Sequence, residues 1–240
     1  MTQISDSIYT GAATTNTVIG DPVSGLGIRA GQTYFQDFVP LTKNPVAYAA
    51  SQSVAAAANI VLSAGTGVTT AVINGITRYV ADVPRCVTVT SGGNDTGITF
   101  TVRGFDKYGA AMSSLVTGGN AATVTTLKSF ASVYQVFTSG SVASTVTVGT
   151  ADIFGLDVAV IDKSYLYTVG NQAKQIDTGT ALVADTTNPA TALTGDVRGT
   201  YAPTYASNGT ARVLIETTLN ASQLAYGTAA QTAIFGVTQA

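Results

Sequence analysis

The chain has 240 residues, of which 10% are charged, and its formal net charge is −2. Its eleven Lys and Arg residues stand singly, so they cannot neutralise a run of phosphates, and nucleic acid is not expected as a partner. Although 45% of the residues are hydrophobic, no apolar run approaches the roughly 20 residues of a membrane-spanning helix, so no membrane partner is expected either.

Histidine is absent, and Cys86 is the single cysteine. The lack of histidine removes Ser-His-Asp and Cys-His mechanisms and most zinc sites. One cysteine cannot form an internal disulfide, and no histidine is present to activate its thiol. Cys86 is therefore expected to be an unreactive strand residue. Residues 1–6 lack the features of a secretory signal, so none is expected.

The first segment, residues 1–50, shows weak periodicity, with apolar islands among Gly and Thr. We interpret it as an extended N-terminal arm or a loosely packed segment. Its large apolar side chains either cap the main core or anchor the arm onto a partner protein. The residues predicted to bind a partner are Ile8, Tyr9, Tyr34, Phe35 and Phe38.

The next stretch mixes two signals before it becomes clearly β-prone. Four alanines at 55–58 favour a short helix, whereas residues 59–62 favour a strand. Two β-prone runs, 68–73 and 76–80, then flank Asn74-Gly75, which is a strong signal for a two-residue turn. The sequence therefore predicts a β-hairpin over residues 68–80.

From residue 85 to residue 150 the chain alternates Val, Thr and Ile between turn residues. In 97–103, Ile98, Phe100 and Val102 share one face, which is typical of a half-buried strand. In residues 86–90 the pattern is the same, with Val87 and Val89 on one face and Cys86, Thr88 and Thr90 on the other. Further β-prone runs occur at 114–117, 122–127, 133–138 and 145–148.

Beyond residue 150 the β character continues without a linker rich in Pro or charge. The β-prone runs there are 156–160, 165–169, 181–184, 197–201 and 212–219. We therefore expect residues 51–240 to form one β-sandwich body or two docked sandwiches. The predicted fold class is all-β, an antiparallel β-sandwich of the jelly-roll or immunoglobulin-like type, with an extended N-terminal arm.

Carboxylates are the remaining candidates for chemistry. Glu216, the single glutamate, lies in a predicted strand four residues from Arg212, too far along one face for a direct pair to be implied. Most Asp residues stand beside Gly, Asn or Thr in predicted turns, whereas a glycosidase needs two opposed carboxylates. We expect no enzyme and no cofactor. The alternative left open is a calcium ion at one end of the sheet, held by Asn94-Asp95 and Asp106.

The segment 85–104, which reads RCVTVTSGGNDTGITFTVRG, resembles a sequence type found in tailed-bacteriophage virion proteins. The likeness includes the turn at 106–109 and the Thr-Gly step at 117–118, and it extends more loosely to 196–200 and 236–237. This resemblance implies a capsid decoration protein, also called a cement protein. Such a protein binds outside the shell and stabilises contacts between capsid subunits.

The resemblance also implies the setting of the protein. Its partner would be the major capsid protein, it would form a homo-oligomer, and it would be made in the host cytoplasm and located on the capsid surface of the virion. The low charge density fits this expectation, because a neutral surface can be buried against a neighbour without leaving unpaired charges. Two alternatives stay open. One is a tail, fibre or head-tail adaptor component, and the other is a carbohydrate-binding adhesin that uses Tyr165 and Tyr167.

Overall fold

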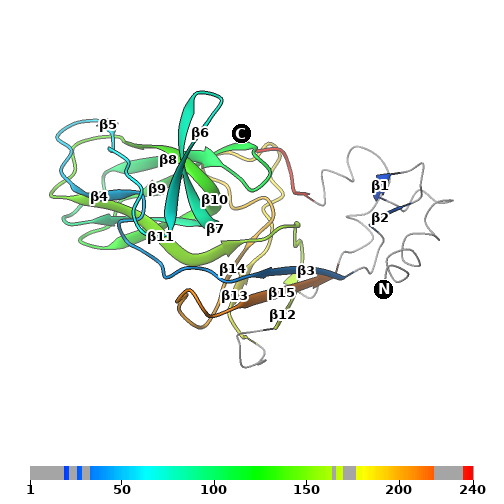
Figure 1. Ribbon diagram of the computed structural model, residues 1–240. Helices are drawn as coiled ribbons and strands as arrows, with labels where there is room; N and C mark the ends of the chain where they lie inside the picture. The colour runs from blue at the N-terminus through cyan, green and yellow to red at the C-terminus, as the bar shows by residue number, and fades with distance from the viewer. Residues whose placement is uncertain are drawn as a thin grey trace.

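The computed structural model describes residues 19–21, 26–28, 33–163, 166–169, 177–218 and 235–239. The elements of this part of the chain are strands, which form three antiparallel sheets (Figure 1). The prediction of an all-β, antiparallel, sandwich-like fold is therefore confirmed. The predicted residues Ile8, Tyr9 and Tyr165 lie outside the described part of the chain.

The largest sheet has ten strands. They are β4 (Ala49–Gln52), β5 (Ala58–Asn59), β6 (Val68–Ile73), β7 (Ile76–Ser91), β8 (Thr99–Phe105), β9 (Ala111–Thr117), β10 (Thr123–Thr138), β11 (Val146–Gly155), β13 (Thr180–Leu182) and β14 (Thr200–Ala202). The main order is β13-β14-β11-β7-β10-β8-β9, with β4 paired to β11, β5 to β10 and β6 to β7.

Two smaller sheets complete the described structure. The three-stranded sheet has the order β12-β15-β3, and its strands are β12 (Leu166–Val169), β15 (Val213–Thr218) and β3 (Thr33–Phe38). The two-stranded sheet pairs β1 (Ile19–Asp21) with β2 (Leu26–Ile28). The pairing of β3 with β15 joins residues that are far apart in sequence, and Phe38 is in register with Val213.

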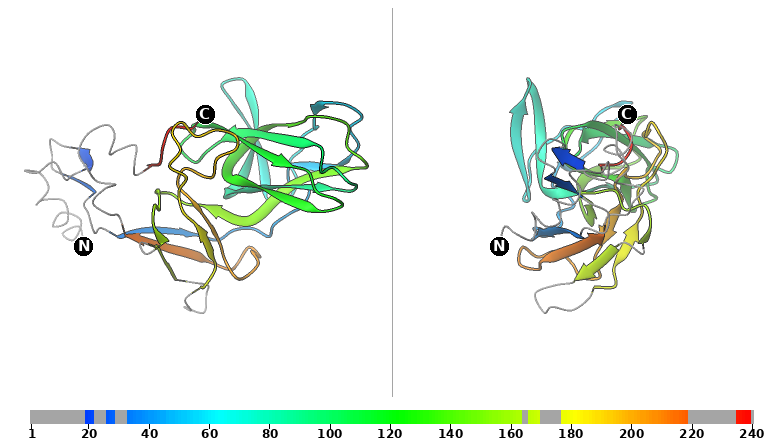
Figure 2. Two further views of the ribbon diagram at one scale, coloured as in Figure 1. Left: turned by 180° about the vertical axis from the view of Figure 1, so that it is seen from behind. Right: turned by 90° about the vertical axis from the view of Figure 1, so that its right-hand side faces the viewer.

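The ten-stranded sheet curls strongly around its own hydrophobic core (Figures 1 and 2). The curl brings side chains from five long strands into one buried cluster, as the alternating pattern of each strand requires. Val87 and Val89 of β7 and Phe100 and Val102 of β8 are all fully buried in it. The predicted apolar faces of these two strands are therefore confirmed.

The predicted hairpin over 68–80 is also confirmed. β6 pairs with the beginning of β7 from Val68 opposite Ala81 to Ile73 opposite Ile76. Asn74 and Gly75 form the two-residue turn with φ angles of 52° and 76°. Positive φ at both turn residues matches the right-handed twist of the flanking strands, and Asn and Gly accept it most readily.

The alternative of a helix at 55–58 is wrong. Residues 53–57 form a loop between β4 and β5, and Val54 and Ile60, which lie before and after the four alanines, are buried. Backbone hydrogen bonds connect both flanks to neighbouring segments, from Val142 N to the Val54 carbonyl (2.9 Å) and from Ile60 N to the Val136 carbonyl (2.8 Å). These tertiary contacts outweigh the small helix preference of alanine.

The two strands predicted at 122–127 and 133–138 are one continuous strand, β10. The strand has no turn in the middle. Its register with β7 shifts instead, between Thr125 and Ser129 and again between Phe130 and Ser132. Such bulges bend a strand and increase its twist without ending it. The bend allows β10 to pair with β7 along its first half and with β8 along its second.

The strand predicted at 156–160 is a buried loop. Its backbone forms hydrogen bonds with loop residues rather than with a neighbouring strand. Leu156 N donates to the Gly199 carbonyl (3.1 Å), and Val160 N donates to the Arg198 carbonyl (3.1 Å). The apolar run therefore fills a second, smaller core, which also contains Phe154 and Ile215. Burial on several sides, rather than strand pairing, explains its hydrophobicity.

Residues 33–50, which belong to the segment expected to be an arm, pair and pack with the rest of the chain. β3 pairs with β15 along six residues, and Ala47 and Tyr48 are fully buried in the main core. The division of the chain at residue 50 stays a prediction.

Candidate functional site

A buried ion pair joins the second half of the chain to the main sheet. Arg198 Nη1 lies 2.9 Å from Asp106 Oδ2, and both side chains are buried. Arg198 Nε donates to the Leu156 carbonyl (3.1 Å), while Asp106 Oδ1 accepts the backbone N–H groups of Tyr108 (2.9 Å) and Ala110 (2.8 Å). The pair therefore holds the β8–β9 turn against the loops that follow β11 and precede β14.

A second cluster surrounds Asp157. Its Oδ2 atom lies 2.5 Å from Lys107 Nζ and accepts a hydrogen bond from the Tyr34 hydroxyl (2.9 Å), while Tyr108 donates to its backbone carbonyl (2.7 Å). Burial, together with the Asp157 charge, raises the pKa of Tyr34 above its ordinary value. We call the set the charged junction, and it consists of Tyr34, Asp106, Lys107, Tyr108, Asp157 and Arg198.

Three of the residues predicted to bind a partner can be placed, and they do not point the same way. Tyr34 contacts the buried Asp157, and the Phe38 ring packs edge-on against Phe154 with centroids 5.2 Å apart. Phe35 alternates with these two and is 57% exposed. Of the three, Phe35 therefore has the most exposed ring, while Tyr34 and Phe38 contribute to the molecule's own packing.

The other residues that the sequence analysis considered for chemistry or binding can be taken one by one. Burial, with a smaller effect of Asp196, raises the pKa of the Cys86 thiol. Arg212 pairs with Asp37 rather than with Glu216. For the adhesin alternative, Tyr165 is outside the described residues, and of Tyr167 only the backbone in β12 is described.

The prediction that Asp95 and Asp106 share one end of the sheet is wrong. Asp95 N donates to the Gly119 carbonyl (2.9 Å), beyond the end of β9, whereas Asp106 N donates to the Ala110 carbonyl (3.0 Å) in the β8–β9 turn. The seven residues of β8 separate these points by about 20 Å. Among the described residues, no group of three His, Cys, Asp or Glu side chains could hold a metal ion.

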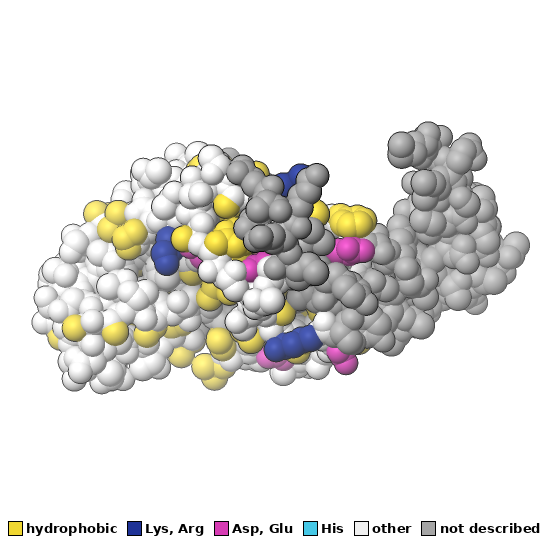
Figure 3. Space-filling view, turned by 90° about the horizontal axis from the view of Figure 1, so that it is seen from below, with side chains coloured by type: hydrophobic (Ala, Val, Ile, Leu, Met, Phe, Trp, Pro, Cys, Tyr) yellow, Lys and Arg dark blue, Asp and Glu magenta, His cyan; other side chains and the backbone are white. Residues whose placement is uncertain are grey.

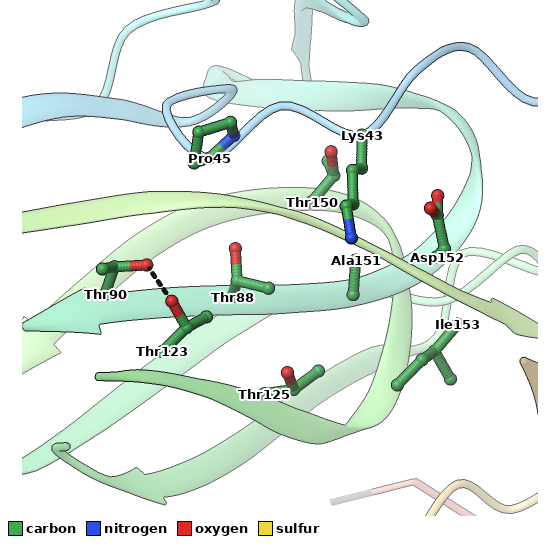
Figure 4. Close-up of a pocket in the computed structure, with 10 residues that line it drawn as sticks. All are labelled: Lys43, Pro45, Thr88, Thr90, Thr123, Thr125, Thr150, Ala151, Asp152 and Ile153. Carbon is green, nitrogen blue, oxygen red and sulfur yellow. Dashed lines mark hydrogen bonds between the residues drawn. The ribbon is translucent and has the colours of Figure 1, made fainter. Parts of the chain in front are cut away.

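A trough of about 520 Å³ crosses the outer face of β7, β10 and β11 (Figure 4). Thr88 lies opposite Thr125 and Thr90 opposite Thr123, and the last two hydroxyls are 2.8 Å apart. Threonine hydroxyls occupy one end of the trough, and Lys43 stands with Asp152 toward the other; the remaining lining residues are Pro45, Thr150, Ala151 and Ile153. None of these residues is aromatic, so the trough lacks the ring platform on which sugars usually stack.

The threonine end of the trough leads to a part of the surface that carries no exposed charge. Its loops are rich in Ala, Ser, Thr, Gly and Asn, and Asp95 is their single ionisable residue. In Figure 3 the same end of the molecule, at the left, shows no charged side chain. We call this surface the neutral end, and it consists of the loops 53–57, 92–98, 118–122 and 139–145.

Backbone hydrogen bonds hold the loops of the neutral end together. Ala121 N donates to the Gly93 carbonyl (2.7 Å), and Gly92 N donates to the Thr145 carbonyl (2.7 Å). The Asp95 side chain is fully buried beneath them, where its Oδ1 accepts the N–H of Ala143 (2.7 Å). The one carboxylate therefore organises the loops from inside and contributes no charge to the surface.

Sequence reasoning did not identify the neutral end, although a signal for it exists. Residues 44–77, 108–127 and 129–151 contain no Asp, Glu, Lys or Arg. These runs are separated in sequence by charged residues, and only the pairing of the strands shows that their loops meet. The uneven distribution of charge, rather than its low average, is the informative pattern.

No family model, no curated protein and no solved structure significantly matches the chain. In the described part of the chain, no helix has both the length and the hydropathy needed to cross a membrane.

Proposed function

We propose that this protein is a structural component of a tailed-bacteriophage virion, which binds the outside of the capsid and stabilises contacts between capsid subunits. The neutral end is the observation that supports the proposal from the structure, and the resemblance of residues 85–104 supports it from the sequence. In this proposal the protein has no enzymatic activity. Its partner is the major capsid protein, and it acts as a homo-oligomer.

The neutral end suits a permanent contact with another protein surface. Its small side chains allow the partner backbone to approach closely, and no exposed charge has to be desolvated. The internal hydrogen bonds of the loops mean that little ordering entropy is lost on binding. A homo-oligomer that repeats this contact on several capsid subunits would gain strength from linked binding events.

The first experiment measures whether the protein is present in purified particles and in what copy number, by quantitative mass spectrometry relative to the major shell protein. A copy number of the same order as the shell protein supports the proposal. Far fewer copies favour a tail, fibre or head-tail adaptor component. Absence from particles overturns the virion proposal, and a glycan-binding screen then tests the adhesin alternative.

The second experiment tests the neutral end itself. Ala56 and Ser144 are exposed there, and lysine at both positions places two charges in the proposed contact. We expect particle binding to weaken at least about tenfold, because each buried, unpaired charge costs several kcal/mol. The matched control places lysines at the exposed residues Ile161 and Leu182, away from these loops. Equal binding by both variants would contradict the role of the neutral end.

A further inference from the structure

The β6–β7 hairpin extends away from the curled sheet (Figures 1 and 2). Apolar side chains flank the turn at its tip. Val72 is 71% exposed, and Ile73 and Ile76 are exposed beside the turn. No residue from 68 to 77 is charged. A two-stranded ribbon with its apolar side chains in water is only marginally stable, so this hairpin needs a partner to bury its tip.

β6 is an edge strand. It pairs with β7 on one side, and among the described residues no backbone group from 69 to 73 bonds to any other segment. Soluble proteins usually protect such an edge with a charge, a proline or a bulge. The sequence Val-Thr-Thr-Ala-Val-Ile contains no charge and no proline, and its register with β7 is regular.

The register identifies which backbone groups face outward. Ile73 and Ile76 flank a two-residue turn, so they exchange both of their hydrogen bonds, and bonded pairs then alternate with non-bonded pairs. Ile73, Ala71 and Thr69 therefore bond inward to β7. The N–H and C=O groups of Thr70 and Val72 point to the open edge. Val68 also points outward, but its N–H is already bonded to the Gly65 carbonyl (3.1 Å).

We propose that β6 pairs with β6 of a second copy of the chain, antiparallel and about a twofold axis that passes beside Ala71. In this register Thr70 lies opposite Val72 of the second copy, and Val72 lies opposite Thr70. Four backbone hydrogen bonds form, and they use the four outward groups that Thr70 and Val72 of each copy offer. The two hairpins become a continuous four-stranded sheet with the order β7-β6-β6-β7.

The edge fits a second copy because it is complementary to itself. The spacing of two residues between the outward pairs allows a twofold axis between them, which is the requirement for an isologous contact. Ala71 faces its own copy, and its small side chain avoids a clash there. The cation in register with Ala71 is Arg78, which lies on the inner strand with its guanidinium 3.4 Å from the centre of the Phe105 ring, so no like charges meet at the axis.

The test uses the isolated full chain and measures its dimerisation by analytical ultracentrifugation. Lysines at the exposed residues Thr70 and Val72 (T70K/V72K) place like charges opposite each other across the axis, and T70E/V72E does the same with negative charges. We expect each variant alone to dimerise at least about tenfold more weakly than the native chain. A mixture of the two should recover a heterodimer, because each lysine then meets a glutamate. The control I161K/L182K should dimerise like the native chain.

Hydrogen exchange separates edge pairing from other modes of association. The backbone amides at positions 70 and 72 should be protected from exchange in the native dimer and should exchange freely in T70K/V72K. The Ala71 amide should be protected in both proteins. A monomeric native chain, unchanged dimerisation of T70K/V72K, or free exchange of Thr70 and Val72 in the dimer would each overturn the proposal. This inference specifies the self-association included in the proposed function. Because its test contains no particles, its failure is distinguishable from failure of capsid binding.

Discussion

The neutral end and the charged junction lie beyond the two ends of β8, and they use ionisable residues in opposite ways. At the neutral end the one carboxylate, Asp95, is buried and bonded to Ala143, and the surface above it is uncharged. At the charged junction, Arg198 and Asp106 are paired out of contact with water, and Asp157 holds Lys107. Charge is thus concentrated where segments of one chain meet and absent where we propose that another chain binds.

The difference reflects what each contact requires. An ion pair inside one chain can have nearly ideal geometry, because the same fold places both partners permanently. A surface that docks to a separate protein must lose its water each time it binds, and unpaired charges make that loss costly. The junction therefore gives the body a fixed internal geometry, while the neutral end stays available for burial. Substitutions at each of the two sites test this comparison.

The largest effect is expected at the charged junction. The variant Asp106→Ala leaves the buried Arg198 guanidinium without its carboxylate and removes the oxygen that accepts two backbone N–H groups in the β8–β9 turn. We expect the free energy of unfolding to fall by about 3–5 kcal/mol, measured by urea titration. The control is Asp37→Ala, which breaks the exposed pair with Arg212 and should have only a small fraction of that effect. Equal losses in the two variants would contradict the internal role of the junction.

A smaller effect is expected from packing beneath the neutral end. A Cβ atom at Gly118 would lie 2.6 Å from the Asp95 carbonyl oxygen and 2.9 Å from Phe100. Gly118→Ala should therefore destabilise the protein by about 1–3 kcal/mol, in the range of overpacked cores. A Cβ atom at Gly97, in the same set of loops, would contact nothing within 4 Å. Thermal unfolding should leave Gly97→Ala close to the native chain, and a similar loss in both would show that the loops do not depend on this close contact.

The smallest effect is expected from pH near neutrality. With no histidine in the chain, we expect the free energy of unfolding to change by less than about 0.5 kcal/mol between pH 5 and pH 8. Hydrogen bonds from the backbone of Thr187 and Gly195 lower the pKa of Asp185, and the bond from Arg212 lowers that of Asp37. A lowered pKa in the folded state stabilises the fold above the unfolded pKa, and this contribution disappears as pH falls through the folded value.

Acid unfolding checks that sign. Stability should fall below about pH 4, where these carboxylates become protonated. The variant Asp185→Asn lacks one of the titrating groups, so its stability should fall less steeply with acid than that of the native chain. Denaturant titrations at several pH values measure both curves. A steeper loss in the variant, or a strong change between pH 5 and pH 8, would contradict the assignment.

Several parts of the fold could be read from local sequence. Asn74-Gly75 between two β-prone runs predicted the hairpin, because only a few residue types accept positive φ at both turn positions. Alternation in 97–103 predicted which face of β8 is buried. The alanines at 55–58 suggested a helix that does not form, because their weak helix propensity is outweighed by the burial of the flanking residues. The split of β10 into two predicted strands has a similar origin, since a bulge resembles a turn in sequence.

The candidate site was less accessible to sequence reasoning. Aromatic residues in 33–38 were recognised as important, but pairing with β15 decides that Phe35 points outward while Tyr34 and Phe38 point inward. The carboxylates were assigned to turns, and no sequence pattern connects Asp106 with Arg198, which are 92 residues apart. Ion pairs of this kind depend on loops meeting across the fold.

The sequence by itself determined the all-β class, the absence of histidine chemistry and the apolar faces of the central strands, because these follow from composition and from the two-residue period of a strand. Only the tertiary structure decided that four loops without exposed charge form one surface, that β6 keeps an open edge, and that Asp106 meets the buried Arg198 at the charged junction. Those features arise from strand order and from the bends in β7 and β10, which bring distant segments together through non-local pairing that local sequence does not encode.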